Sequence, residues 1–287
     1  MTTYRIPEIA QKYLDYDMIQ KHTDLPLFPD YRTRLLYAFL NRHSVLAGYS
    51  ELYSLVTSLV QVGLDTHDQV SVNSDIKEQK AARSRQLKVL AGDYFSSRFY
   101  HLLSLAGRID LIGVLSEAIC EANRLKMNLY LAMKGAELTA EEYLRQTVEV
   151  KSELYLSFSG LLENGAGGVW PRLLKLFTRC EVLLQEIVRS ESSQQYRDSW
   201  GFWHVQQFGT RDEQKLLRQE ESDPAKLRAL WLKYKVASQL YGQLESCMSE
   251  LQTAIQGLES EPLRQELKSI GEPIRRYLSA PRATQEV

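Results

Sequence analysis

Apolar residues recur every three or four positions along most of the chain, which is the spacing of one face of an α-helix. The longest run steps from Leu227 to Leu258 in alternating threes and fours. It starts at Asp223-Pro224, an N-cap residue followed by proline, and predicts one long helix that Gly242 would bend. Strand-like alternation of apolar and polar residues extends over a few positions at most. The pattern therefore predicts an all-α, single-domain helical bundle.

Further helices are expected at about 86–105, 111–129, 139–162 and 173–187, with a last one after Pro262. Thr139 and Glu142 have the spacing of a capping box at the start of the third of these helices. Two polar segments, 69–85 and 190–222, are expected to be loops. The single domain would then comprise an N-terminal helical segment (1–45), a core (46–190), the second loop (190–222), long C-terminal helices (223–280) and a tail (281–287).

The second polar segment carries four large aromatic residues, Trp200, Phe202, Trp203 and Phe208. Aromatic side chains are enriched in protein interfaces, so this segment is a candidate for binding a partner. The alternative is that the aromatic residues pack the segment onto the chain's own core, which is the more common arrangement.

Composition narrows the possible functions. The 287 residues include 35 basic and 36 acidic ones, with a formal net charge of −1. Proteins that bind nucleic acid usually have a marked excess of basic residues, so nucleic acid is not an expected partner. Apolar runs fall short of the roughly 20 residues that span a bilayer, and the first residues lack the apolar core of a signal peptide. We therefore expect a cytoplasmic protein without a transmembrane segment.

The three cysteines, Cys120, Cys180 and Cys247, are far apart in the sequence and form no Cys-x-x-Cys pair. Each lies on the apolar face of an expected helix. We therefore expect buried free thiols that pack as small apolar side chains, with neither zinc nor a disulfide.

The residues most suggestive of chemistry are Asp65, His67 and Asp68, which follow an apolar helix pattern from Leu52 to Val60. Asp65 and Asp68 are three residues apart, so both carboxylates lie on one helix face. Such a pair would supply part of a magnesium site completed by carboxylates from elsewhere, or it would be a solvated helix end. His67 has no second zinc ligand at helical spacing, so zinc is not expected there.

Two further polar residues interrupt apolar helix patterns. Asp93 follows Gly92, and because glycine inside a helix costs about 1 kcal/mol relative to alanine, another backbone is expected to approach closely there. The Asp93 carboxylate then needs a partner or a wet cavity. Lys151 stands at an apolar position, where its ammonium group either meets an anion or a cavity or extends to the end of the bundle.

Several catalytic signatures are missing from the sequence. It has no Gly-x-x-x-x-Gly-Lys loop, no Gly-x-Gly-x-x-Gly, no Gly-x-Ser-x-Gly elbow and no His-Glu-x-x-His. Nucleotide-driven and nucleophilic chemistries therefore have no support.

Taken together, these segments resemble the trans-prenyl diphosphate synthases, most closely the small subunits (component 1) of bacterial two-component heptaprenyl (or hexaprenyl) diphosphate synthases. Residues 63–70 stand where catalytic members carry a first aspartate-rich motif, Asp-Asp-x-x-Asp. Residues 85–96 resemble the Leu-x-Gly-Asp-Tyr helix of that family. Residues 149–154 are similar to a Lys-Thr-x-x-Leu segment whose lysine, here Lys151, faces diphosphate. The resemblance extends from about Leu52 to Leu184, with a weaker echo at 258–278.

The chain departs from this family at both metal-binding motifs. The first keeps Asp65 and Asp68 but has Gln69 next to them and no Asp-Asp pair. At the second, Phe-Gln-x-x-Asp-Asp-x-x-Asp is replaced by residues 177–185, which keep one carboxylate, Glu181. In catalytic members, magnesium held by both motifs neutralises the departing diphosphate. The resemblance therefore implies a chain with no catalytic residue, no metal site and no cofactor of its own.

The resemblance further implies a heterodimer with a catalytic subunit that carries intact Asp-Asp-x-x-Asp motifs and binds magnesium. This chain would support that subunit's chain elongation, share a tunnel for the prenyl diphosphate, help set product length and serve menaquinone side-chain synthesis. The family dimerises through the Gly-Asp-Tyr helix and the next helix. Residues expected at the interface or tunnel are Tyr94, Phe95, Arg98, Phe99, Leu115, Ala118, Ile119 and Ala122. Their spacing is equally that of residues in an intramolecular core.

Two alternatives stay open. One is a stand-alone prenyl synthase or terpene-cyclase-like enzyme whose degenerate metal site uses Asp65, Asp68 and Glu181. The other is a helical adaptor unrelated to isoprenoids, which would dock through residues 200–208.

Overall fold

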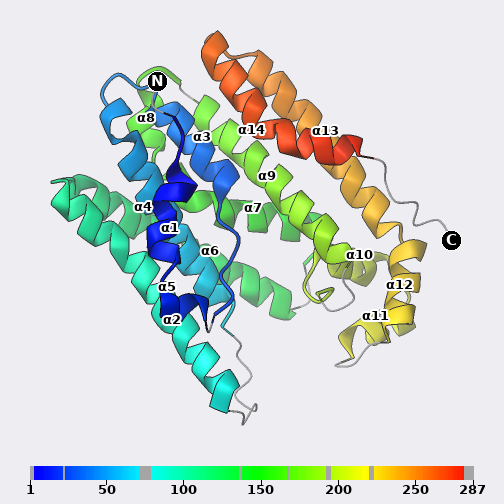
Figure 1. Ribbon diagram of the computed structural model, residues 1–287. Coiled ribbons are helices and arrows are strands. Elements are labelled where there is room, and N and C mark those ends of the chain that lie inside the picture. Colours follow the sequence, from blue (N-terminus) through cyan, green and yellow to red (C-terminus); the bar gives the residue numbers. More distant parts are fainter. Residues whose placement is uncertain are drawn as a thin grey trace. The chain divides into compact units, whose positions relative to one another are not determined.

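The computed structural model describes residues 3–21, 23–70, 79–135, 138–166, 168–191, 195–219 and 223–280, with only the backbone of 79–81 and 163–166. Across these residues the regular structure consists of fourteen α-helices and one 3-10 helix, η1, and contains no strand (Figure 1). The predicted all-α class is confirmed. None of the helices in the described part of the chain is both long and apolar enough to cross a bilayer.

The chain divides into two compact units, and three helices, α6, α7 and α9 (Val169–Ser190), run across the division. Unit 1 comprises Met1–Ile119 and Leu154–Trp170, and unit 2 comprises Cys120–Glu153 and Pro171–Val287. Helix α6 (Ile109–Gly135) leaves unit 1 at residue 119, and α7 (Ala140–Leu156) returns to it at residue 154. That the whole chain is one domain stays a prediction.

Unit 1 is built around α4, which packs against three other helices, α1, α3 and α5. Nearly every residue of α4 is buried. Three of its buried hydroxyl groups, those of Thr57, Ser58 and Thr66, donate to carbonyl oxygens three or four residues earlier in the helix. The elements of this unit are α1 (Ile6–Leu14), α2 (Asp17–Gln20), α3 (Asp30–Leu40), η1 (Ala47–Tyr49), α4 (Ser50–Asp68), α5 (Gln79–Leu105) and α8 (Ser159–Ala166).

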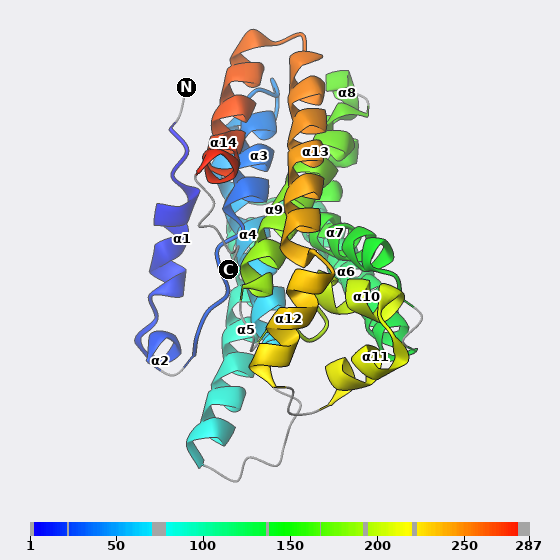
Figure 2. The same ribbon diagram turned by 90° about the vertical axis from the view of Figure 1, so that its right-hand side faces the viewer.

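Unit 2 contains the remaining helices together with the larger parts of α6 and α7, and its helices α13 and α14 form an antiparallel hairpin (Figure 2). The proline predicted to open the last helix, Pro262, lies in the first turn of α14 behind the N-cap Ser260. The helices of this unit are α9 (Val169–Ser190, from Pro171 on), α10 (Trp200–Phe208), α11 (Arg211–Arg218), α12 (Pro224–Lys233), α13 (Val236–Gln256) and α14 (Glu261–Ser279).

The segment 190–222 was predicted to be a loop, and the structure corrects this because two short helices, α10 and α11, lie within it. The Ser199 hydroxyl accepts the first free N–H of α10, from Phe202. Thr210 and Glu213 form a reciprocal capping box at the start of α11. These local caps supply the hydrogen bonds that make such short helices possible within a polar sequence.

The single helix predicted from residue 223 to residue 258 is wrong, because the chain breaks between α12 and α13. Asp223 and Pro224 do start α12, with the Asp223 carboxylate accepting the N–H of Ala225. The break lies at Lys235, whose φ of 51° is in the left-handed region, and not at Gly242. The apolar spacing continues through Lys235, so periodicity alone does not reveal the break.

Two smaller boundaries also differ from the prediction. Residues 79–85, expected in a loop, form the start of α5, whereas 71–78 and the tail 281–287 lie outside the described residues. The helix predicted over 139–162 ends at Leu156, and α8 follows from Ser159. The Thr139 hydroxyl does accept the N–H of Glu142, as the capping-box spacing predicted.

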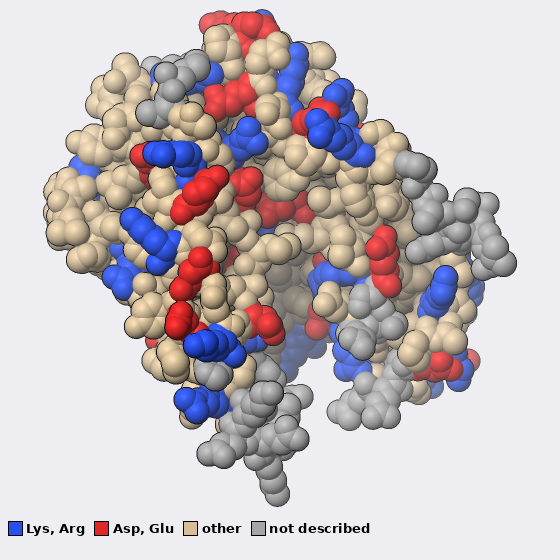
Figure 3. Space-filling model, viewed as in Figure 1, with Lys and Arg blue, Asp and Glu red and all other residues tan. Residues whose placement is uncertain are grey.

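Charged groups of both signs are interspersed on the surface. On the face drawn in Figure 3, Lys and Arg side chains alternate with Asp and Glu side chains, and neither sign gathers into a broad patch. This distribution accords with the near-zero net charge, and the described residues of this face form no basic track for a phosphate backbone.

Candidate functional site

The Asp65 carboxylate on α4 is the end point of a polar chain that starts at a buried arginine in unit 1. Gln61 donates through its Nε2 to the Asp65 Oδ1 atom at 2.9 Å. Arg32 of α3, 1% exposed, donates through Nη1 to the Gln61 Oε1 atom at 3.2 Å. The Arg32 guanidinium also lies 5.4 Å from the centre of the Tyr155 ring. Asp65 is therefore tied to the interior of its own unit through the Gln61 amide.

His67 is held by α5. Its Nε2 atom lies 3.3 Å from the Asp93 Oδ1 atom, so the partner that the sequence required for Asp93 is His67. A Cβ atom added to Gly92 would lie 2.6 Å from the His67 ring, and one added to Gly63 would lie 2.9 Å from the Gly92 carbonyl oxygen. Gly63 is therefore needed for the backbones of α4 and α5 to pack this closely, whereas Gly92 leaves room for the His67 ring. The close approach predicted at Gly92 is confirmed.

Asp68, the last residue of α4, is exposed, whereas Asp65 is half-buried. Among the described residues of either unit, no group of three or more His, Cys, Asp or Glu side chains is placed to hold a metal ion. Magnesium prefers several oxygen ligands in octahedral geometry. The groups behind Asp65, an amide and a buried arginine, do not supply the oxygen ligands that magnesium prefers.

Glu181 and Lys151 lie in unit 2, on α9 and α7. The Glu181 side chain is buried and Lys151 is half-buried, and both have polar partners. The residues chosen from the two degenerate motifs are thus divided between the units, with Asp65, His67 and Asp68 in unit 1.

A buried carboxylate that the sequence did not single out, Glu186 of α9, organises unit 2. Its Oε1 atom accepts hydrogen bonds from the Tyr143 hydroxyl at 3.0 Å and from Arg189 at 2.8 Å. Its Oε2 atom accepts one from the backbone N–H of Trp200 at 2.6 Å. Arg189 also donates to the Arg197 carbonyl oxygen. Burial raises the pKa of the Tyr143 hydroxyl. Glu186 therefore fixes the start of α10 against α7 and α9.

The aromatic residues of α10 face the interior of unit 2. Trp200, Phe202 and Trp203 are buried, and Trp200 stacks on His204 with ring centres 4.7 Å apart. Phe208 alone among the four predicted aromatic residues is exposed, at 60%. Of the two alternatives, the structure supports packing onto the chain's own core for three of the four side chains, so these three are not available to anchor a partner.

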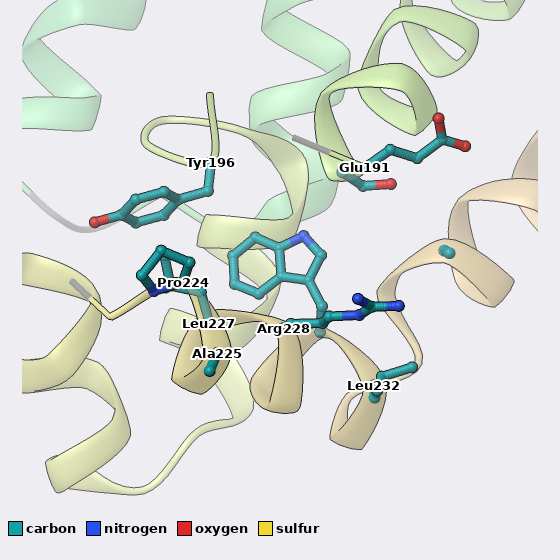
Figure 4. Close-up of a pocket in the computed structure, with 10 residues that line it drawn as sticks. Glu191, Tyr196, Pro224, Ala225, Leu227, Arg228 and Leu232 are labelled. Atoms are coloured by element: carbon teal, nitrogen blue, oxygen red, sulfur yellow. The ribbon is translucent and has the colours of Figure 1, made fainter. Parts of the chain in front are cut away.

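A pocket of about 480 Å³ opens beside α12 (Figure 4). In this view the Tyr196 ring lies across from Pro224 and Leu227, and the lining also includes Trp231, whose ring meets Tyr196 edge to face at 6.2 Å. Charged groups of Glu191 and Arg228 also line it. An apolar floor with a few polar groups is typical of small-molecule pockets of this size. None of the site residues predicted from the sequence lines this pocket, whose walls come from Ser190, Glu191 and Tyr196 and from residues 224–237.

Five of the eight residues predicted for the interface or tunnel have buried side chains: Phe95, Phe99, Leu115, Ala118 and Ala122. Phe95, for example, packs against Ile19, Val62 and Ala91. Tyr94, Arg98 and Ile119 are half-buried, with the Arg98 guanidinium 4.2 Å from the Tyr94 ring centre. The five buried side chains pack within their own chain, and their placement at a subunit interface stays a prediction. A role in a tunnel stays a prediction.

Comparison with known proteins identifies the family. The family model for heptaprenyl diphosphate synthase (HEPPP synthase) subunit 1 matches residues 16–223. The chain belongs to the heptaprenyl diphosphate synthase subunit 1 family. A curated relative, heptaprenyl diphosphate synthase component 1 of Geobacillus stearothermophilus, is 36% identical over 91 residues. That match covers 32% of this chain and 39% of the relative's length.

Solved structures similar to this subunit 1 family member are prenyl synthases. Geranylgeranyl pyrophosphate synthase from Lactobacillus brevis superposes with a TM-score of 0.71 at 13% identity, over 94% of both chains. Decaprenyl diphosphate synthase from Rhodobacter capsulatus gives 0.66 at 14% identity, over 95% of both chains. At this low identity the likeness establishes the fold, which is that of the all-α isoprenoid synthases.

Proposed function

We propose that this member of the subunit 1 family is the non-catalytic subunit of a two-component heptaprenyl diphosphate synthase. It pairs with a catalytic subunit that carries two intact Asp-Asp-x-x-Asp motifs and holds magnesium. The observation that carries this proposal is the state of the first motif: Asp65 accepts a hydrogen bond from Gln61, and Gln69 follows Asp68 where a catalytic chain needs carboxylates. Without a full carboxylate set, magnesium cannot neutralise a departing diphosphate.

The second motif supports the same proposal. Residues 177–185 keep Glu181 as their one carboxylate, and that side chain is buried. A single buried glutamate offers fewer oxygen ligands than octahedral magnesium uses. Catalysis is therefore assigned to the partner subunit, and this chain contributes structure to the complex.

Exposed apolar side chains on α6, in unit 2, supply a surface for the partner, and α5, in unit 1, carries exposed apolar side chains of its own. On α6, Met127, Tyr130 and Leu131 are exposed by 55–57% and lie three and four residues apart, on one helix face. On α5, Leu90 and Tyr100 are exposed by 62% and 51%. Large apolar side chains at this exposure are typical of protein interfaces. The proposed interface lies on the outward face of α6 in unit 2, one of the two helices expected from the sequence.

In the complex, this chain helps to set product length, and Lys151 faces diphosphate. The prenyl diphosphate product occupies a tunnel shared with the partner and serves menaquinone side-chain synthesis in the cytoplasm. These parts of the proposal follow from membership of the subunit 1 family and from the resemblance of residues 149–154 to the diphosphate-facing segment of catalytic members.

Reconstitution tests the proposal. The purified chain, a candidate catalytic subunit and the two together are incubated with isopentenyl diphosphate, an allylic primer and magnesium, and the chain length of the products is measured. We expect no turnover by this chain alone and long-chain product from the mixture. If this chain alone consumed isopentenyl diphosphate, the stand-alone synthase with a degenerate metal site would replace the present proposal.

A pair of matched variants tests the surface. Leu131→Arg places a charge on the exposed face of α6, and Leu232→Arg does the same on α12, where Leu232 is 50% exposed. We expect Leu131→Arg to weaken co-purification with the catalytic subunit at least tenfold and Leu232→Arg to leave it unchanged. Equal behaviour of the two variants would exclude the α6 face as the interface.

A further inference from the structure

Two cysteines that are 67 residues apart in the sequence meet inside unit 2. The Sγ atoms of Cys180 on α9 and Cys247 on α13 lie 3.3 Å apart. Both thiols are free and buried, with side chains 0% and 5% exposed. The sequence prediction of free, buried thiols is confirmed for these two, whereas Cys120 is exposed, contrary to its prediction, because it lies on an outward face of α6.

Hydrogen bonds hold the sulfur atoms of the two cysteines in contact. The Cys180 thiol donates to the Cys247 sulfur, and the Cys247 thiol donates to the Leu176 carbonyl oxygen on α9 at 3.6 Å. The bond from Cys180 lowers the pKa of the Cys247 thiol, since a donor at the sulfur favours its thiolate. The Arg179 guanidinium adds to this effect. Cys247, the sulfur that accepts the bond, is therefore the better nucleophile of the two.

We propose that Cys180 and Cys247 are a peroxide-oxidisable pair that forms a disulfide joining α9 to α13. The Cys247 thiolate attacks one oxygen of hydrogen peroxide, which breaks the O–O bond, releases hydroxide that becomes water, and leaves a sulfenic acid. The Cys180 sulfur then attacks the sulfenic sulfur, the S–S bond forms, and the sulfenic oxygen leaves as a second water. Two thiols are oxidised, one peroxide is reduced, and both thiol protons end in water.

The consequence is a covalent tie across unit 2. The tie closes a loop of chain that includes α10, α11 and α12. Closing a long loop stabilises a fold mainly by restricting the unfolded chain. Oxidation would therefore raise the melting temperature by about 5–10 °C for a chain of this size. Cys180 immediately precedes Glu181, so the cross-link also ties the segment that replaces the second aspartate motif to α13.

The test uses the full chain carrying Cys120→Ser, which removes the exposed thiol. The protein is treated with hydrogen peroxide and denatured, its free thiols are alkylated, and its peptides are analysed by mass spectrometry. We expect one cross-linked peptide pair containing residues 180 and 247, a mass lower by two hydrogen atoms, a raised melting temperature, and reversal of all three by dithiothreitol.

The matched variants add Cys180→Ala or Cys247→Ala to that background. Each should retain one thiol, form no internal cross-link and show no rise in melting temperature with peroxide. Because the cross-linked peptide is sought in a chain with both thiols present, poor folding of an alanine variant leaves the test intact. Complete alkylation of both thiols after peroxide, or oxidation of either to sulfinic acid without a cross-link, would overturn the proposal.

Discussion

The imidazole ring of His67 occupies the space beside Gly92 that any side chain at residue 92 would fill. A Cβ atom at Gly92 would lie 2.6–2.7 Å from three ring atoms, and the ring's Nε2 atom is 3.3 Å from the Asp93 carboxylate. The position of the His67 ring thus explains both residues of the Gly92-Asp93 pair. The glycine admits the ring, and the aspartate next to it meets the ring nitrogen.

Alanine at three glycines should have three different effects on the free energy of unfolding. Gly63→Ala places its methyl group 2.9 Å from backbone atoms of Gly92 and Ser96, which cannot move aside, and should destabilise by about 2 kcal/mol. The methyl group of Gly92→Ala meets only the tip of the His67 side chain, which can move. The cost of that movement, about 1 kcal/mol, is offset by the higher helix propensity of alanine, so the free energy of unfolding should change little. Urea unfolding measures each value.

Gly113 on α6 provides the control for that series. An added Cβ atom there has nothing within 4 Å, so Gly113→Ala should stabilise the protein by up to about 1 kcal/mol. If Gly63→Ala proved as harmless as Gly113→Ala, the close approach of α4 and α5 would be refuted.

Asp65 should behave as a hydrogen-bond acceptor and not as a metal ligand. Asp65→Asn keeps an oxygen for the Gln61 amide and should leave both stability and the magnesium-dependent activity of the reconstituted complex unchanged. Asp65→Ala loses that bond and should destabilise by about 1 kcal/mol without a change in magnesium dependence. Activity assays over a magnesium titration measure the dependence. A higher magnesium requirement in Asp65→Asn would show that this carboxylate binds the ion.

Among the residues of the network that joins α7, α9 and α10, substitution of Glu186 should lower the stability of the protein most. Glu186→Gln removes the charge that pairs with Arg189, which is itself 29% exposed, and should cost about 2 kcal/mol. Tyr143→Phe removes one donor to Glu186 and should cost about 1 kcal/mol. In a double-mutant cycle the two costs should not add, because both act on the same Oε1 atom. Additive costs would contradict the network.

Acid should destabilise the protein partly through Glu213. Hydrogen bonds from Lys233 and Tyr234 lower the pKa of Glu213 from 4.5 to about 2. A carboxyl group whose folded pKa is depressed contributes stability above its unfolded pKa and loses that contribution as the pH falls through the folded pKa. The loss should therefore fall between about pH 4.5 and pH 2. Glu213→Gln should show a shallower decline in melting temperature over that window, and an unchanged slope would contradict the assignment.

The sequence by itself determined the helical class and most helix positions. Unbroken spacing of threes and fours, with caps such as Thr139 and Asp223, fixes where apolar faces lie along a helix, and this information is local. The shortage of carboxylates at residues 63–70 and 177–185 is also written in the sequence, and it indicated a chain without a metal cluster of its own.

Only the tertiary structure decided what each polar group meets. Spacing places Phe95 on an apolar face but does not say whether that face covers its own core or a partner, and the structure buries it. The partners Arg32–Gln61 and Cys180–Cys247 are 29 and 67 residues apart, so no local pattern connects them. The break at Lys235 depends on its left-handed backbone, which the continuing apolar spacing does not reveal. The apolar periodicity of the sequence indicates which face of each helix is buried. Which helices are in contact depends on the tertiary fold, which brings together residues far apart in the sequence.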